Sequence, residues 1–258
     1  MTAEIKILKK AAFKDITLVV GLPGTAYIGK LSVDYLVQQL KAEPIAEVYS
    51  KHFPPYVIIK EDGTVELLRN ELHRFKGKDG HEIVFLTGNS QALSPEGQYD
   101  LANIILDWAQ KHGIKRVISV AALVTEKPFD TPLVYFTATS PSVFEEMKKL
   151  DLKSLDQGII GGENGLIIGL AKKRDIEGIC LLAETHGYQT SQGEYVTDAK
   201  AAKAALNVLN RMLSLKVNME PMDKQAEQMD ELLVKMGEIE RRVRQEMEQS
   251  TKKPSYVT

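Results

Sequence analysis

The stretch GLPGTAYIGK, residues 21–30, is the first part of the chain whose residue types and spacing could do chemistry. It follows the apolar run ITLVV and contains a glycine, four further residues, Gly29 and Lys30, which nearly matches the phosphate-binding loop of nucleoside triphosphatases. Leu31 stands where those enzymes carry the Ser or Thr whose hydroxyl holds magnesium. Lys30 and Asp34 lie four residues apart and form a solvated pair on the expected helix. The glycines therefore indicate a tight strand-to-helix turn with close packing.

A second group of polar residues follows the apolar run GICLLAE, where Glu184 and His186 stand in the sequence AETHGY. Reactive groups of α/β enzymes gather at the carboxyl ends of strands, and Glu163, Asn164 and residues 88–91 (GNSQ) lie at further element ends. A general acid–base pair needs a histidine and a carboxylate within hydrogen-bond reach of a substrate. The same residues also fit a structural role, with His186 hydrogen-bonded in a turn. The chain contains no GxSxG, HExxH or CxxC motif, so no motif supports a serine hydrolase or a zinc site.

A third feature is the glycine-rich segment GGENGLIIG, in which Gly161, Gly165 and Gly169 are four residues apart. On a helix this spacing makes a bare ridge, which lets another backbone approach closely. A dinucleotide-binding fingerprint needs its glycines in the turn directly after a first strand, with a different spacing. We therefore interpret the segment as a packing surface.

Short β-rich runs alternate with helical patterns along the chain, which is typical of an α/β layer fold. Strands are expected at residues 16–21, 46–50, 56–60, 115–123, 132–139 and 178–185. Two Asp-Gly pairs, 62–63 and 79–80, predict hairpin turns. Helices are expected up to residue 41, from Ser94-Pro95 to about residue 111, from Ser140-Pro141, and over 197–215. We predict a three-layer α/β/α sandwich with a mixed sheet over residues 1–218.

Residues 219–250 differ in kind, because they follow a break at Pro221, lack a strand pattern and are rich in helix formers. We predict a long amphipathic helix. Its apolar arc contains Met229, Leu232, Leu233, Met236, Ile239, Val243 and Met247. An isolated helix is marginal in water, so this arc must pack on its own domain, on a second copy or on a partner protein. Residues 251–258 form a polar tail that is too short to fold alone.

The composition excludes several classes of function. Of the 258 residues 43% are hydrophobic and 26% charged, and the net charge of −2 provides no positive field for nucleic acid. The single cysteine, Cys180, excludes an internal disulfide and fits a reducing compartment. No apolar run reaches the roughly 18 residues of a membrane span, and the N-terminal residues lack the apolar core of a signal peptide. We expect a cytoplasmic protein without nucleic-acid or membrane partners.

Taken together and in order, several segments resemble the proteasome assembly chaperone family, in particular its archaeal homologues. They are GLPGTAYIGKLSVDYL, FPP followed by EDGTVEL, LTGNSQ with YDLANIILDWAQKHGIKRVISV, GGENGLIIGLAKKRDIEGICLLAETHGY and DAKAAKAALNVL, and they run from about residue 16 to 215. The resemblance implies a fold similar to that of the nucleoside phosphorylases without their chemistry. It also implies an ATP-independent, non-enzymatic scaffold that forms homo-oligomers and engages proteasome α-subunits or the α-ring, with a co-chaperone paralogue as a further partner. No cofactor, metal or catalytic residue is expected.

Members of that family often end in a hydrophobic–Tyr–any triplet that docks between α-subunits. This chain ends PSYVT, so its tyrosine is third from the end and departs from the triplet. We expect the helical arm and the tail to contact the partner through Met229, Leu233, Met236, Val243, Met247, Tyr256, Val257 and Thr258. One alternative is an α/β enzyme or small-molecule-binding protein with a cleft near Glu184 and His186. Another is a purely structural oligomer joined by its C-terminal helix.

Overall fold

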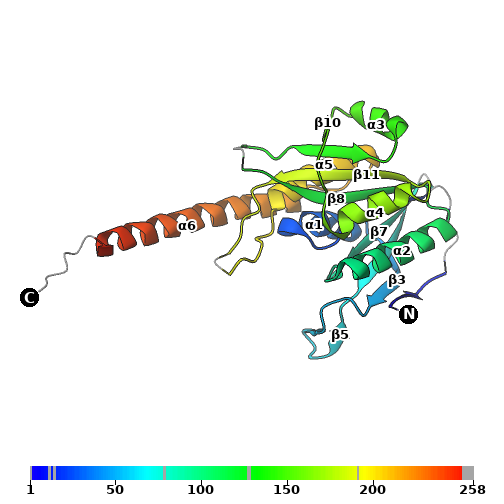
Figure 1. The fold of residues 1–258 in the computed structure, drawn as a ribbon, viewed down its shortest axis with the longest axis horizontal. Coiled ribbons are helices and arrows are strands. Elements are labelled where there is room, and N and C mark those ends of the chain that lie inside the picture. Colours follow the sequence, from blue (N-terminus) through cyan, green and yellow to red (C-terminus); the bar gives the residue numbers. More distant parts are fainter. Residues whose placement is uncertain are drawn as a thin grey trace, which may run out of the picture. The chain divides into compact units, whose positions relative to one another are not determined.

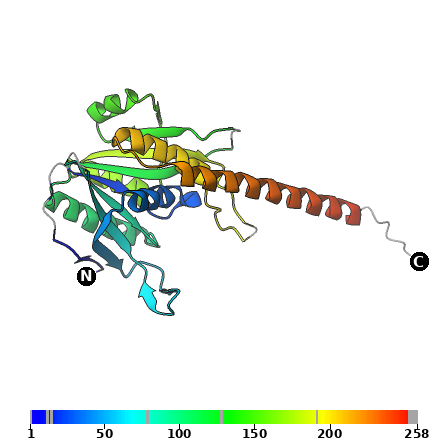
Figure 2. The same ribbon diagram turned by 180° about the vertical axis from the view of Figure 1, so that it is seen from behind.

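A nine-stranded mixed β-sheet forms the centre of the fold, and helices pack on both of its faces (Figures 1 and 2). The computed structural model describes residues 2–10, 13, 16–77, 80–126, 129–190 and 192–251, with the backbone alone at 236–240 and 243–251. Contacts divide the chain into two units, Met1–Asn218 and Met219–Thr258, and all the described strands belong to the first. The predicted α/β class with a mixed sheet is confirmed.

The strands of this sheet are β1 Ala3–Ile7, β2 Ile16–Val20, β3 Glu43–Ser50, β6 Asn70–Lys76, β7 Glu82–Gly88, β8 Arg116–Val124, β9 Val134–Ala138, β10 Lys153–Ser154 and β11 Glu177–Thr185. They are ordered β1-β3-β6-β7-β2-β8-β11-β9-β10. The middle four, β7, β2, β8 and β11, are parallel. The flanking pairs β1–β3, β3–β6, β6–β7 and β11–β9 are antiparallel. The carboxyl ends of four neighbouring strands therefore meet at one edge of the sheet.

The helices are α1 Ile28–Gln39, preceded by a 3-10 turn at Thr25–Tyr27, α2 Pro95–Lys111, α3 Pro141–Lys148, α4 Gly162–Lys172, α5 Ala199–Met212 and α6 Glu220–Thr251. On one face of the sheet α2 contacts α4, and on the other α1 contacts α5. Figure 1 views the first of these faces and Figure 2 the second. The serine–proline starts of α2 and α3 are confirmed, since Ser94 Oγ accepts from the Gly97 N–H and Ser140 Oγ from the Val143 N–H.

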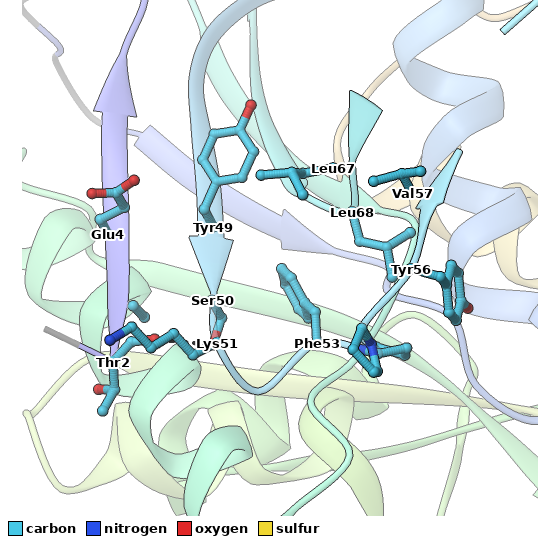
Figure 3. Close-up of a pocket in the computed structure, with 13 residues that line it drawn as sticks. Thr2, Glu4, Tyr49, Ser50, Lys51, Phe53, Tyr56, Val57, Leu67 and Leu68 are labelled. Atoms are coloured by element: carbon cyan, nitrogen blue, oxygen red, sulfur yellow. Dashed lines mark hydrogen bonds between the residues drawn. The ribbon is translucent and has the colours of Figure 1, made fainter. Parts of the chain in front are cut away.

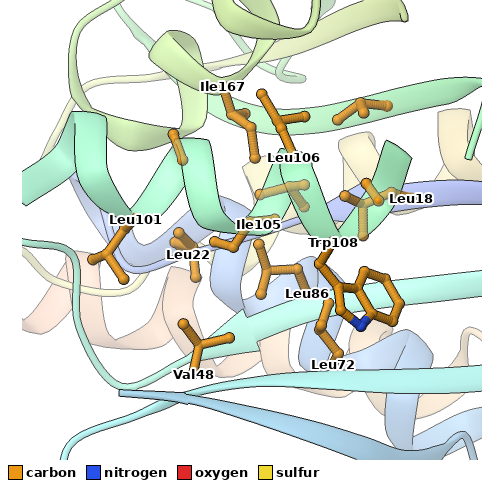
Figure 4. Packing of buried hydrophobic residues seen from close by; sticks show 14 of the residues in the cluster. Leu18, Leu22, Val48, Leu72, Leu86, Leu101, Ile105, Leu106, Trp108 and Ile167 are labelled. Atoms are coloured by element: carbon orange, nitrogen blue, oxygen red, sulfur yellow. The ribbon is translucent and has the colours of Figure 1, made fainter. Parts of the chain in front are cut away.

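The alternation of strand side chains divides the core between the two faces. Toward α2 and α4 the sheet presents Leu18, Leu86 and Leu182, which pack with Leu101, Ile105 and Ile167 of the helices; Figure 4 shows this packing around α2. All of them are less than 4% exposed. Burial of one such side chain stabilises the fold by about 1.5–3 kcal/mol. Cys180 belongs to the same cluster as a small, fully buried side chain.

A separate two-stranded sheet, β4 Val57–Ile59 with β5 Val65–Leu67, lies outside the large sheet. Its turn is the predicted Asp-Gly pair, with Gly63 at φ 77°, a backbone conformation that glycine adopts most readily. The second predicted hairpin joins β6 to β7. Gly80 has φ 85° in that turn, whereas Asp79 lies outside the described residues.

The prediction of a glycine ridge in α4 is wrong for two of its three members. A Cβ atom added at Gly161 or Gly169 would meet no neighbouring heavy atom within 4 Å among the described residues. At Gly165 an added Cβ would lie 2.5 Å from Ile160 Cγ2 and 2.6 Å from the Ile160 carbonyl oxygen. The close approach at Gly165 is therefore to the loop just before the same helix, and no second helix in the described part of the chain is seated on the three glycines.

Candidate functional site

The glycine loop after β2 is closed by the chain's own hydrogen bonds. The Gly21 N–H donates to the Leu86 carbonyl at 2.9 Å and the Tyr27 N–H to the Gly24 carbonyl at 3.0 Å, while the Leu22 N–H donates to Asn164. A phosphate-binding loop needs such N–H groups free to point at the anion. In this loop three of them already have partners.

The two flanking glycines of that loop serve packing, as expected. An added Cβ at Gly21 would collide with the Gly29 carbonyl oxygen, and one at Gly29 would collide with the Val120 carbonyl oxygen. Helix α1 therefore sits directly on β2 and β8. The predicted Lys30–Asp34 ion pair is present, with Nζ 2.7 Å from Oδ2, so the lysine is engaged along its own helix.

Two side-chain amides join the ends of β2 and β7 to the start of α4. The Asn164 side chain accepts from the Leu22 N–H at 3.1 Å and donates to the Leu22 carbonyl at 3.0 Å. Gln91 Nε2 donates to the Pro23 carbonyl at 2.5 Å, and its Oε1 accepts from the Glu163 N–H at 2.8 Å. Glu163, Asn164 and the GNSQ segment, which lie at element ends, therefore meet here, but they do not meet Glu184 and His186 as the sequence suggested.

A cavity of about 720 Å³ opens beside these amides, at the carboxyl edge of the parallel strands. Gln91 and Asn164 line it together with apolar side chains such as Leu155 and Leu182. None of its lining residues in the described part of the chain carries a charge. Pockets at this edge are where open α/β sheets bind ligands, and the neutral lining suits an uncharged molecule.

Glu163 is fully buried beside this cavity, in the first turn of α4. Neither carboxyl oxygen has a hydrogen-bond partner among the described residues. Burial raises the pKa of Glu163 to about 8, and the nearby Ala92 N–H opposes the rise without reaching hydrogen-bond geometry. The side chain is therefore held as an uncharged carboxylic acid at neutral pH.

Glu184 and His186 do not line this cavity, and each is engaged elsewhere. The Glu184 carboxylate accepts from the Leu133 N–H at 3.0 Å and from the Tyr135 hydroxyl at 3.2 Å, which fastens β9 to β11. His186 Nδ1 donates to the Thr125 carbonyl at 3.0 Å, and its ring stacks on Phe129 with centroids 4.3 Å apart. Both side chains therefore stabilise local structure, which agrees with the structural role that the sequence also allowed for them.

The residues predicted to contact a partner lie in α6 and beyond it. Met229 is buried, at 5% exposure, and Leu233 is half-buried. Met236, Val243 and Met247 belong to the helix, but their side chains lie outside the described part of the structure. Tyr256, Val257 and Thr258 also lie outside the described residues.

Sequence analysis did not single out the surface of the β4–β5 hairpin as functional. Tyr56, Val57, Ile59, Val65 and Leu67 are all exposed there. A cavity of about 530 Å³ lies at the base of the hairpin, and in Figure 3 Tyr49, Phe53, Leu67 and Leu68 surround it. The signal was present in the sequence, because residues 56–59 before the Asp-Gly turn are all apolar, and after the turn the apolar Val65 and Leu67 flank Glu66.

Within the described residues no group of three or more His, Cys, Asp or Glu side chains could hold a metal ion. None of the helices described is long and apolar enough to cross a membrane.

Comparison with known proteins gives consistent similarities along most of the chain. A family model described as the PAC2 family matches residues 18–236. The uncharacterized protein MJ1210 of Methanocaldococcus jannaschii is 33% identical over 241 residues, which cover 93% of this chain and 89% of that protein.

Two solved structures from Pyrococcus furiosus are also similar. One is PbaB, an archaeal proteasome activator, with 30% identity and a TM-score of 0.84 over 92% of this chain and 100% of that chain. The other is PbaA in its monoclinic form, an archaeal homolog of proteasome-assembly chaperone, with 28% identity and a TM-score of 0.73 over 95% of this chain and 97% of that chain.

Proposed function

The chain belongs to the PAC2 family, which confirms the resemblance its motifs showed, and from this premise we propose that it is an ATP-independent scaffold for proteasome assembly. Its partners are proteasome α-subunits or the finished α-ring. It acts without catalysis or a cofactor, as a cytoplasmic homo-oligomer, and a paralogue is a candidate co-chaperone. We further propose that the globular unit is a three-layer sandwich of the nucleoside phosphorylase type.

The observation that carries this proposal is the likeness to PbaB at 30% identity over 92% of the chain. It extends across both units of the chain, whereas a shared fold alone would leave function open. PbaB is a proteasome activator and PbaA a homolog of the assembly chaperone. A second form of the proposal is therefore that this chain activates a finished proteasome particle.

The glycine loop supports the ATP-independent part of the proposal. Its Gly21, Leu22 and Tyr27 N–H groups are bonded within the chain, and the position of the magnesium-binding hydroxyl is Leu31. Such a loop lacks the metal ligand that nucleotide hydrolysis uses, and three of its donors are already bonded.

We assign partner contact to α6 and the tail. The helix has 32 residues, and an exposed amphipathic helix gains stability chiefly by burying its apolar arc. Methionine, which occurs at 236 and 247, adapts well to the surface of a partner, whereas Met229 is buried. The tail adds two lysines, a proline and Tyr256, although its tyrosine lies one position earlier than the family triplet requires.

Binding to purified α-subunits and to assembled core particles of the same organism tests the proposal. We expect the full chain to bind one or both, and a chain cut after residue 220 to melt as a folded protein but to lose binding. The substitution Leu233→Asp should weaken binding, whereas Gln228→Asp, on an exposed position of the same helix, should not. Binding that survives the truncation would place recognition on the globular unit, and absence of binding by the full chain would overturn the proposal.

A second candidate function is the binding of an uncharged small molecule, now in the cavity beside Gln91 and Asn164 and not near His186. The neutral lining and the volume of about 720 Å³ favour it. A screen of neutral fragments by ligand-observed NMR tests it, with Ala122→Trp as the variant that fills the cavity. Hits that this variant leaves unchanged would contradict the assignment.

A further inference from the structure

The β4–β5 hairpin presents an aliphatic face to solvent. Its cross-strand pairs are Val57 with Leu67 and Ile59 with Val65. Their exposures are 46% and 60% for the first pair and 73% and 63% for the second. Side chains opposite each other in an antiparallel pair share a face of the sheet, so the four make one continuous surface. A contiguous apolar patch of this kind marks a place where another molecule binds.

The same hairpin carries a projection and a recess. Val57 and Leu67, at its base, help to line the cavity of about 530 Å³ with Tyr49 and Phe53, as Figure 3 shows. The pair Ile59 and Val65 lies closer to the turn and outside that cavity. One chain therefore offers both an exposed aliphatic tip and an apolar hollow that such a tip would fill.

Several charges beside the face are paired within one chain. Arg69 lies 2.8 Å from both Glu66 and Glu71 and 3.4 Å from Glu47, and Lys60 lies 3.5 Å from Glu66.

The lining of the cavity includes one residue of each sign, Glu4 and Lys51.

We propose that this hairpin face is a self-association surface whose occupant is a second copy of the chain. The two hairpins pack face to face about a two-fold axis, and Ile59 and Val65 of each enter the cavity at the base of the other. A two-fold contact brings the same patch together on both subunits, with reciprocal contacts. This symmetry fits a surface that carries both a projecting tip and a recess that can receive the tip of the other copy. The assignment goes beyond the proposed function, because it names a surface and holds whether or not the proteasome is the partner.

The double substitution Ile59→Asp with Val65→Asp in the full-length chain tests the proposal by analytical ultracentrifugation. Both positions are exposed, so the fold should survive, which the melting temperature checks. The weight-average mass should fall, because each pair held by the hairpin separates. Ile159→Asp is the matched control, since Ile159 is 98% exposed elsewhere on the same unit, and it should leave the mass unchanged.

Disulfide trapping supplies a second, positional readout. Cys180 is the only native cysteine and is buried, so only the introduced, exposed cysteines are available for disulfide formation. A mixture of an Ile59→Cys chain and a Leu67→Cys chain should form a covalent heterodimer under mild oxidation. A mixture of an Ile159→Cys chain and a Leu67→Cys chain should form no covalent heterodimer.

An unchanged mass together with absence of the trapped heterodimer would overturn the proposal. If the double aspartate variant keeps its mass but loses binding to α-subunits, the face belongs to a different partner and the second-copy assignment is likewise wrong. Failure of the wild-type chain to bind α-subunits, with self-association lost in the variant, would contradict only the proposed function.

Discussion

The side chain of Asn164 replaces a backbone partner for Leu22, a residue 142 positions earlier in the chain. It accepts from the Leu22 N–H at 3.1 Å and donates to the Leu22 carbonyl at 3.0 Å. Both residues are buried. The glycine loop after β2 and the first turn of α4 are thereby held together at the carboxyl edge of the sheet, where the neutral cavity opens.

Replacing Asn164 with Ala should destabilise the fold strongly. The change leaves the N–H and carbonyl of Leu22 buried without partners, and each such group costs about 1–3 kcal/mol. Urea unfolding measures the effect. The control is Asn103→Ala, which removes a single, part-buried bond to Arg174 and should cost less. Equal losses in the two variants would show that the Leu22 clamp is not a main support of this edge.

Glu163→Gln should stabilise the protein increasingly as the pH rises. Burial raises the pKa of Glu163 from 4.5 to about 8. Below pH 4.5 the carboxyl is protonated in the folded and the unfolded chain alike, whereas between 4.5 and 8 only the unfolded chain ionises, so the free energy of unfolding falls across that window. At pH 7 the variant should be more stable by about 3 kcal/mol.

Urea unfolding at pH 5 and pH 8 provides the comparison for that prediction. Glu96→Gln is the control, because Glu96 also lies in the first turn of a helix but is exposed. Its difference from wild type should barely change with pH. A Glu163→Gln difference that stays constant across the window would mean that the buried carboxyl does not change its protonation in this range.

Substitutions at two glycines of α4 should change the stability of the fold in opposite directions. Gly165→Val brings a side chain against Ile160 and its carbonyl, which should cost about 1–3 kcal/mol. Gly169→Ala adds a methyl group in open space and should stabilise the helix by about 0.5–1 kcal/mol. Thermal melts of the two variants test the pair. A gain from both substitutions would remove the packing role assigned to Gly165.

The near match to a phosphate-binding loop should not bind nucleotide. Calorimetry with ATP and magnesium should give no saturable heat, because three of the loop donors are already bonded and Leu31 offers no metal ligand. Lys30→Ala should cost little stability, since a part-exposed pair with Asp34 contributes about 0–1 kcal/mol. A saturable signal that Lys30→Ala abolishes would instead establish a nucleotide site.

Features that depend on neighbours in sequence were predictable. Ser94 and Ser140 before proline start helices as expected, because capping involves atoms only three residues away. The Asp62-Gly63 turn follows from the conformational freedom of glycine. The apolar runs that became β2, β8 and β11 were recognisable because strands buried on both faces are continuously apolar. The strand β10 has two residues, too few to show any periodicity.

The sequence by itself determined where most elements begin, that they form an α/β layer fold, and that the glycine loop lacks a magnesium ligand. Tertiary structure alone decided which element ends meet. Glu184 and His186 lie together at the end of β11. The Glu184 carboxylate nevertheless accepts a hydrogen bond from Tyr135 on the antiparallel neighbour β9, whereas His186 donates one to the Thr125 carbonyl. Gln91, Glu163 and Leu22 converge from three distant segments. Local preference reaches only a few residues along the chain, whereas the order and direction of strands arise from the packing of the whole sheet, so no pattern of neighbours could specify these contacts.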